Sequence, residues 1–172
     1  MVRAPIRDLP ALIVKLKPQP LTETHWKHAI KTGIAGALAI FLAERLHLPQ
    51  GYWAAISAVI VMQSEFQATL RAGFTRLAGT AIGALVALPF AETIHSNIVG
   101  FGVAVVLTVL ICSVLKLEES QRLGAATVAL IMLTGPPGAP LLSAIYRFLE
   151  VSLGIIVSLL VTRILWPSRS RL

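Results

Sequence analysis

Charged side chains are scarce in this chain. Asp, Glu, Lys and Arg make up 13% of its 172 residues, and Phe, Trp and Tyr make up 6%. Soluble domains usually carry about 25% charged residues, because their surface must face water. The mean hydropathy of +0.79 is instead typical of a chain that lies mostly in lipid. The composition therefore excludes a soluble globular domain and predicts an all-α integral membrane protein.

Residues that catalytic and metal sites need are also rare. Cys112 is the single cysteine, and it lies inside an apolar stretch, where it is interpreted as a small apolar filler. His25, His28, His47 and His95 lack metal-ligand spacing, and no glycine-rich phosphate loop is present. The sequence thus predicts that the protein is not an enzyme and has no catalytic residue, metal site or cofactor. It also shows no obvious buried Asp or Glu that would form a proton relay.

Six apolar stretches occupy most of the length. They run over residues 29–46, 52–62, 77–91, 98–115, 123–133 and 144–166. A helix needs about 20 residues to cross the hydrocarbon core; four stretches are that long or nearly so, and the second and fifth are shorter. We therefore expect a six-span membrane domain over residues 28–166. A basic arm (1–27), either interfacial or a disordered tail, precedes it, and a stub (167–172) follows.

Positive charge is distributed unevenly between the loops. With the N-terminus inside, 13 of the 15 Lys and Arg residues fall on the inner side and only Arg45 and Arg147 fall outside. This asymmetry follows the positive-inside rule, so both termini are expected in the cytoplasm, Gly51 on the outer face and Ser120 on the inner face. The net charge of +7 then reflects topology, and no nucleic acid partner is expected.

The chain resembles itself when it is shifted by 71 positions. Arg76 then aligns with Arg147 and Gly83 with Gly154, in the same register as a series of apolar matches. Each copy, over about residues 29–91 and 98–166, would hold three spans, and because three is odd the second copy would lie inverted. Inverted repeats with interrupted helices are typical of transporters and channels.

The two short spans occupy equivalent places in the two copies. The second ends in the polar run Gln63-Ser-Glu, and the fifth ends at Thr134, before Gly-Pro-Pro. A helix cannot continue through these prolines. Paired short or broken spans point to a transport site. The alternative is that both helices are simply tilted and their polar ends reach the headgroups.

Small residues recur at every fourth position of the third span. Gly79, Gly83 and Ala87, and Gly154 on the sixth span, are predicted to pack helices closely rather than to bind substrate.

The ionisable residues near the span ends have two interpretations. Lys27, Lys31 and Arg76 are interpreted first as anchors that reach the cytoplasmic headgroups. Arg147 breaks the charge rule, and Glu150 follows it by three residues on the same helix face, where the two can pair. Arg147 is therefore either a substrate contact or half of a structural ion pair.

A path for anions is predicted along the two short spans. Arg76 and Arg147 would supply positive charge at its opposite ends, which lowers the barrier that hydrocarbon presents to a carboxylate. Tyr52 and Trp53 are either interfacial belt aromatics or a platform for a planar ligand. The predicted path residues are Arg76, Arg147, Tyr52, Trp53, Ser57, Gln63, Thr127 and Thr134.

One stretch resembles a known family. The segment from Gly51 to Gln63 opens with Tyr-Trp-Ala and ends in a polar break, and the pattern Arg-x-x-Gly-Thr-x-x-Gly follows at Arg76, Gly79, Thr80 and Gly83. This combination resembles the fusaric acid resistance and aromatic acid exporter family. It is more distantly similar to the plant aluminium-activated malate transporters.

The resemblance implies export of organic anions, chiefly aromatic carboxylic acids, across the cell inner membrane. An anion channel like the malate transporters is an alternative. Many exporters of this type carry cytoplasmic domains or a second membrane half, which this sequence lacks, so a homodimer or higher homo-oligomer is expected. A structural membrane subunit that transports nothing is the competing hypothesis from a different class.

Overall fold

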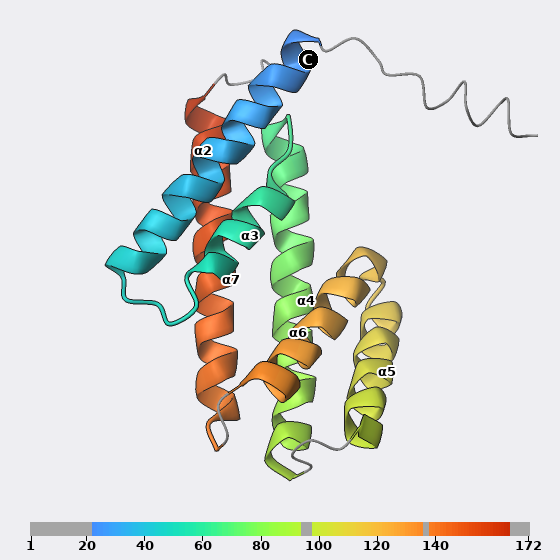
Figure 1. Cartoon of the computed structure of the whole chain (residues 1–172). Helices are drawn as coiled ribbons and strands as arrows, with labels where there is room; N and C mark the ends of the chain where they lie inside the picture. The colour runs from blue at the N-terminus through green and yellow to red at the C-terminus, as the bar shows by residue number, and fades with distance from the viewer. Residues whose placement is uncertain (1–21, 94–97, 136–137, 166–172) are drawn as a thin grey trace, which may run out of the picture.

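The computed structural model describes residues 22–93, 98–135 and 138–165, and within these ranges it is all-helical, as predicted (Figure 1). The helices are α2 (Glu23–Arg45), α3 (Tyr52–Val61), α4 (Phe66–Thr93), α5 (Ile98–Val114), α6 (Gln121–Thr134) and α7 (Pro140–Ile164), with a 3₁₀ turn, η2 (Glu118–Ser120), before α6. Residues 1–21 of the expected arm and the stub lie outside the described residues. Residues 23–27, which were assigned to the arm, form the first turns of α2.

Helices α4 and α7 begin earlier than the apolar stretches indicated. α4 begins at Phe66 and not at residue 77, because the polar residues in between, such as Gln67 and Arg71, are good helix formers. The Thr69 hydroxyl accepts a hydrogen bond from the backbone amide of Gln63, which joins the end of α3 to the start of α4. α7 begins with Pro140, whose fixed φ suits the first helical position.

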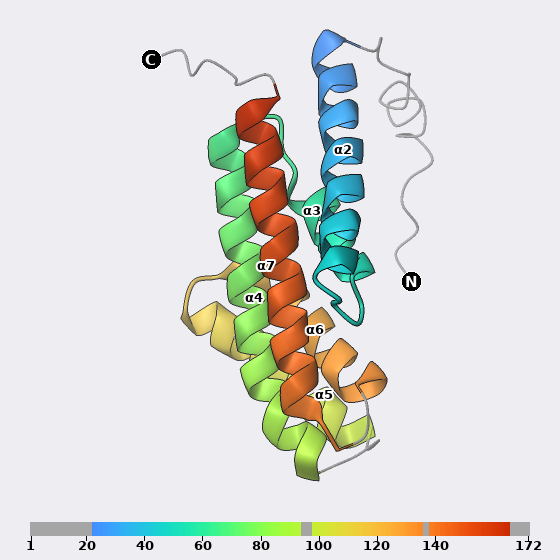
Figure 2. The ribbon, with the colours of Figure 1, turned by 90° about the vertical axis from the view of Figure 1, so that its left-hand side faces the viewer.

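Two of the described helices are both long and apolar enough to cross a membrane by length and composition: α4, over Phe66–Ala91, and α7. They run antiparallel, side by side (Figures 1 and 2). α2 has 23 residues but carries Glu23, Lys27 and Lys31 near its start. α5 has 17 residues, which is about 26 Å of helix against a hydrocarbon core of about 30 Å.

The short helices are α3, with 10 residues, and α6, with 14. α3 packs mainly on α7 and α6 mainly on α4, and each crosses its partner obliquely (Figure 1). At about 1.5 Å per residue, neither is long enough to span a bilayer. The prediction that the second and fifth helices are short is therefore confirmed.

The turns before the short helices lie beside the middle of the long ones. The backbone amide of Gln50 donates a hydrogen bond to Glu150 of α7, and the Ser120 hydroxyl donates one to the carbonyl of Thr75 in α4. Ser120 is fully buried. Each short helix thus begins beside the middle of a long one. That Gly51 lies toward the outer face and Ser120 toward the inner face stays a prediction.

Clusters of small apolar side chains join the helices in threes. The helices α2, α3 and α7 meet through Ala35, Ala39, Ala43, Ala54, Ala58, Met62, Val157 and Val161. The helices α4, α5 and α6 meet through Ala84, Ala87, Ala91, Ala104, Val128 and Ile131, with Ala144 of α7 at the edge. Alanine at these positions lets helix backbones approach closely.

Glycines lie where the long and short helices cross. A Cβ atom at Gly83 would overlap the carbonyl oxygen of Gly124 in α6, and one at Gly154 would overlap the carbonyl oxygen of Ala54 in α3. Both obstacles are backbone atoms, which cannot rotate away. The two crossings therefore require a residue without a side chain.

The remaining predicted packing residues lie on the same face of α4. A Cβ atom at Gly79 would come within 2.7 Å of the Ser120 carbonyl oxygen, and Ala87 is fully buried. The stripe of small residues thus contacts α6 within the chain.

Replacing Gly83 or Gly154 with Ala is expected to destabilise the fold, because the added methyl group meets backbone. Overpacking of this kind costs about 1 to 3 kcal/mol, and thermal unfolding in detergent measures it. Gly33→Ala is the matched control, since a Cβ there meets nothing within 4 Å and alanine favours a helix over glycine. If all three variants melt like the wild type, the crossings do not depend on glycine.

Candidate functional site

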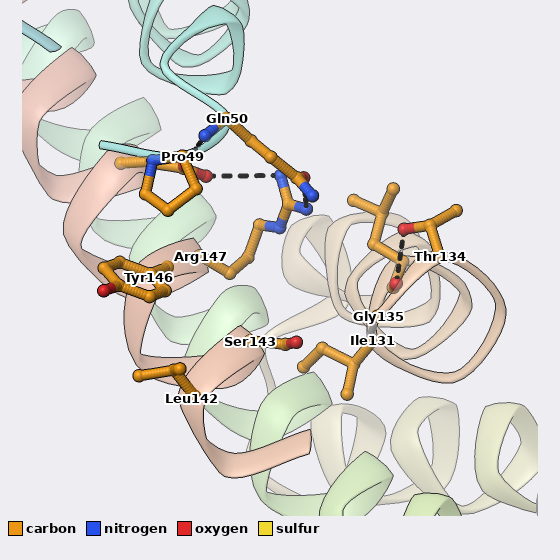
Figure 3. Close-up of a pocket in the computed structure, with 11 residues that line it drawn as sticks. Pro49, Gln50, Ile131, Thr134, Gly135, Leu142, Ser143, Tyr146 and Arg147 are labelled. Carbon is orange, nitrogen blue, oxygen red and sulfur yellow. Dashed lines mark hydrogen bonds and ion pairs between the residues drawn. The ribbon is translucent and has the colours of Figure 1, made fainter. Parts of the chain in front are cut away.

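A cavity of about 230 Å³ lies between the turn before α3, the C-terminal end of α6 and the N-terminal half of α7 (Figure 3). Most of its wall is apolar, and its polar groups gather where the turn meets α7. The lining residues are Pro49, Gln50, Leu130, Ile131, Thr134, Gly135, Leu142, Ser143, Tyr146, Arg147 and Glu150. Figure 3 shows Gln50 and Arg147 pointing toward one another from different elements.

Arg147 is the centre of the polar end. Its Nη2 donates a hydrogen bond of 2.6 Å to Oε1 of Gln50, and its Nη1 lies 3.4 Å from Oε2 of Glu150. The backbone amide of Gln50 donates to the other carboxylate oxygen at 2.9 Å. The guanidinium carbon of Arg147 also lies 4.5 Å from the centroid of the Trp53 ring, a cation–π contact. Groups from α7, from the turn before α3 and from α3 itself thus surround the positive charge of Arg147.

The predicted pairing of Arg147 with Glu150 is confirmed. Their side chains are 7% and 1% exposed, so both charges are removed from solvent. Removing one partner of such a pair leaves the other buried without compensation. Glu150 is thus a buried acid in the cavity wall, where the sequence showed no obvious buried acid for a proton relay.

The polar end has unused hydrogen-bonding capacity. The ion pair of 3.4 Å does not have hydrogen-bond geometry, and among the described residues Nε and Nη1 of Arg147 and Oε2 of Glu150 have no hydrogen-bond partner. Buried polar groups normally find partners, since an unpaired one costs about 1 to 3 kcal/mol. A guanidinium presents its donors in a planar fork that matches a carboxylate. Arg147 therefore has buried donors without partners at the edge of the cavity.

Arg76 lies against α3 as well. It is 7% exposed, and its Nε donates a hydrogen bond of 3.1 Å to the hydroxyl of Ser57. Ser57 follows Trp53 by four residues, about 6 Å along the helix axis, so Arg76 and Arg147 contact the same short helix and their charges repel each other. The sequence predicted these two arginines at opposite ends of an anion path; the structure places both against α3.

The anchor interpretation is wrong for two of the three residues to which it was applied. Arg76 lies ten residues inside α4 and is buried against α3 instead of reaching the headgroups. Lys31 is 3% exposed. Lys27 lies nearer the start of α2, where its more exposed side chain pairs with Glu23.

The other predicted path residues fall into two groups. Thr134 lines the cavity, and Tyr52 lies beside Trp53, with 5.6 Å between ring centroids. Gln63 is exposed just past the far end of α3. Thr127 is buried in α6, where its hydroxyl bonds the backbone of its own helix. Neither of these two lines the cavity.

Gln50 and the hydroxyl-bearing residues Ser143 and Tyr146 were not predicted. Gln50 is 97 residues from Arg147, so no local spacing links them. The one available signal was that Gln50 is a polar residue directly before the Gly-Tyr-Trp segment, at the entry to a short helix.

Comparisons with known proteins find similarity over most of the chain. A protein-family model described as "Aromatic acid exporter family member 1" matches residues 26–165. The UPF0421 protein YgaE of Bacillus subtilis is 27% identical over 139 residues, which cover 81% of this chain and 39% of that protein. A UPF0421 protein of Bacillus cereus is 28% identical, with 80% and 38% covered. UPF0421 protein SERP1427 of Staphylococcus epidermidis is 27% identical, with 81% and 42% covered.

The chain thus spans about two-fifths of the length of these curated relatives. No solved structure matches it.

Replacing Arg147 with Gln is expected to destabilise the protein by about 3 to 5 kcal/mol, because Glu150 keeps a buried charge without its partner. The double variant Arg147→Gln/Glu150→Gln should recover most of this loss, because neither side chain is then charged. Thermal unfolding in detergent measures both. Glu23→Gln is the control, since it breaks the exposed pair with Lys27 and should leave the melting temperature unchanged. Equal stability of the single and double variants would contradict a structural role for the pair.

Proposed function

Because the chain belongs to the aromatic acid exporter family, we propose that it transports organic anions across a membrane, and that its substrates are aromatic carboxylic acids. The observation on which the proposal depends is the buried guanidinium of Arg147, which faces a largely apolar cavity and has donors without partners. The three relatives described above carry only UPF0421 names, so the substrate class is argued from the site and the family.

The polar end of the cavity suits a carboxylate. The unpartnered nitrogens of Arg147 can donate to its oxygens, and such charge-assisted hydrogen bonds are about twice as strong as neutral ones. A fixed cation inside the membrane also lowers the cost of bringing an anion into a medium of low dielectric. An uncharged cavity would reject the same anion.

The rest of the cavity suits an aromatic ring. A dry apolar cavity of about 150 Å³ can hold benzene, and this one has about 230 Å³, enough for one ring with a carboxyl group. Ile131 and Leu142 supply apolar wall, and Thr134 and Ser143 place hydroxyl groups beside it. We propose that the path continues from this cavity along α3 toward Ser57 and Arg76.

We also propose that the chain is an inverted repeat of α2–α3–α4 and α5–α6–α7. Its packing supports this: the third helix of each half crosses the short helix of the other half, at Gly83 and at Gly154, two residues that the 71-position shift aligns. In Figure 1 a half turn in the plane of the picture brings α3 near the place of α6, α4 near that of α7, and α2 to the side where the shorter, more upright α5 lies. Inverted repeats allow alternating access by rocking one half against the other.

The proposed location is the cell inner membrane, with both termini in the cytoplasm. The start of α2 and the end of α7 lie at the same end of the molecule (Figures 1 and 2). Arg163 in the last turn of α7 and Lys27 in the early turns of α2 place positive charge there, in agreement with the positive-inside rule.

Transport is tested by efflux of labelled benzoate from liposomes that contain only this protein, at about pH 8, where benzoate is ionised. The double variant Arg147→Gln/Glu150→Gln removes both charges and is expected to reduce the flux at least about tenfold, because the loss of one charge-assisted contact exceeds 1.4 kcal/mol. Arg71→Gln is the control, since Arg71 is an exposed arginine of α4.

Three outcomes separate the hypotheses. Benzoate flux that saturates and depends on Arg147 supports the proposal. Faster flux of malate than of benzoate favours a channel like the malate transporters. Absence of flux for both anions, with folded protein in the vesicles, favours a structural subunit and contradicts transport.

A homodimer or higher homo-oligomer is proposed for the assembled protein, since two-fold closed assemblies are the commonest form. Mass measurement of the purified chain in mild detergent should return at least twice the chain mass of 18.4 kDa after detergent is subtracted. A single monomer mass across detergents would contradict this proposal.

A further inference from the structure

We propose that Glu150 is a built-in competitor for the transported anion: it occupies Arg147 in the empty site, and a carboxylate that enters the cavity displaces it as Glu150 takes up a proton. This inference rests on the proposed function, because it concerns the same cavity. It assigns Glu150 a role in coupling anion binding to proton uptake.

The contacts of Glu150 are those of a group that can be displaced. Its Oε1 accepts a hydrogen bond from the backbone amide of Gln50, but its Oε2 only approaches Arg147, at 3.4 Å, and accepts no hydrogen bond from a described residue. An entering carboxylate that accepts a hydrogen bond from Nη1 of Arg147 would use the donor that faces Oε2. The two carboxylates therefore compete for this one donor of the guanidinium.

Burial of Arg147 does not by itself require an acid. Arg76 aligns with Arg147 in the 71-position shift and is similarly buried, with 7% of its surface exposed against 6% for Arg147. Its described contact is with the neutral hydroxyl of Ser57, and the structure records no ion pair for it among the described residues. Residue 79, which aligns with Glu150, is a glycine. Arg147 thus has an acid beside it, whereas Arg76, the arginine that aligns with it, has none at the corresponding position.

Charge balance then requires a proton. The empty site holds one cation and one anion, and a second carboxylate would leave an uncompensated negative charge in a buried place. Two carboxylates so close together cannot both stay ionised. The step is that a proton from water joins Glu150 Oε2 while the ligand carboxylate takes its place on Arg147, and no other bond is made or broken. The loaded and the empty site then have the same net charge.

The other ionisable groups around the pair leave Glu150 as the proton acceptor. Tyr146 of α7 lines the cavity, Tyr52 lies at the start of α3, and Arg76 approaches from α4. The described parts of α6 and of the turn before α3 contribute no ionisable side chain to the lining. Once protonated, Oε2 becomes a donor that can bind the ligand carboxylate directly.

The test counts protons. Benzoate is titrated into the purified full chain by calorimetry near neutral pH, where free benzoate is ionised, in two buffers that differ in ionisation enthalpy. The expected result is uptake of about one proton per benzoate bound, with affinity that falls about tenfold for each unit rise in pH over the range where Glu150 is ionised in the empty site.

Glu150→Gln should abolish the proton uptake and make benzoate affinity independent of pH. Glu118→Gln, at an exposed acid of η2, is the matched control and should keep the uptake of the wild type. Because Glu150→Gln can affect folding, Glu150→Asp provides a second variant, which keeps an acid and should keep the uptake.

Two results would overturn the inference and leave transport intact: benzoate that binds the wild type without taking up a proton, or uptake that persists in folded Glu150→Gln. If Glu150→Gln does not fold, the number of protons that the wild type takes up with benzoate still tests the inference. Absence of both binding and liposome flux would instead reject the proposed function.

Discussion

The close crossing of each short helix over a long one is the contact on which the rest of the structure depends. At Gly83 and at Gly154 the backbone of one helix meets the backbone of another, with no room for a Cβ atom. Because α3 and α6 lie so near α7 and α4, the turns that precede them reach the middle of the long helices. Gln50 is thereby brought to Arg147 and Glu150. The cavity and its polar end are consequences of that packing.

The buried charge at Arg147 is tolerated because several partial compensations act together. A carboxylate, an amide oxygen and the face of the Trp53 ring surround the guanidinium. None of them saturates it, since two of its nitrogens lack a hydrogen-bond partner among the described residues. A structural ion pair gains stability from hydrogen bonds on every side. A binding site must instead keep some donors available, and two nitrogens of Arg147 are such donors.

Features set by local pattern were predictable from sequence. The brevity of α3 and α6 follows from the polar and proline breaks, and the pairing of Arg147 with Glu150 follows from helical spacing. Features set by long-range packing could not be predicted from the sequence. The hydrogen bond between Gln50 and Arg147 joins residues 97 apart, and no periodicity marks such a contact.

Arg76 is a second residue whose contacts could not be predicted from the sequence. In sequence, an arginine before an apolar run is most simply a headgroup anchor, because nothing local distinguishes a helix that begins there from one that began ten residues earlier. The early start of α4 places Arg76 inside the helix, and the approach of α3 supplies Ser57 as its partner. Both facts depend on how α3 and α4 pack, which composition and hydropathy do not encode.

The two halves of the proposed repeat use the same positions for different purposes. Residue 79 is a glycine that lets η2 and α6 approach α4, whereas residue 150 is an acid that faces the cavity. Position 57 is a serine that binds Arg76, and its counterpart, Val128, is an apolar core residue. If the halves served packing alone, symmetric positions would tolerate similar small or apolar residues. Instead the acid occurs in the second half, at the cavity that the turn before α3 closes. That asymmetry is the strongest reason to regard the pair of Arg147 and Glu150 as chemistry added to the scaffold and not as part of its support.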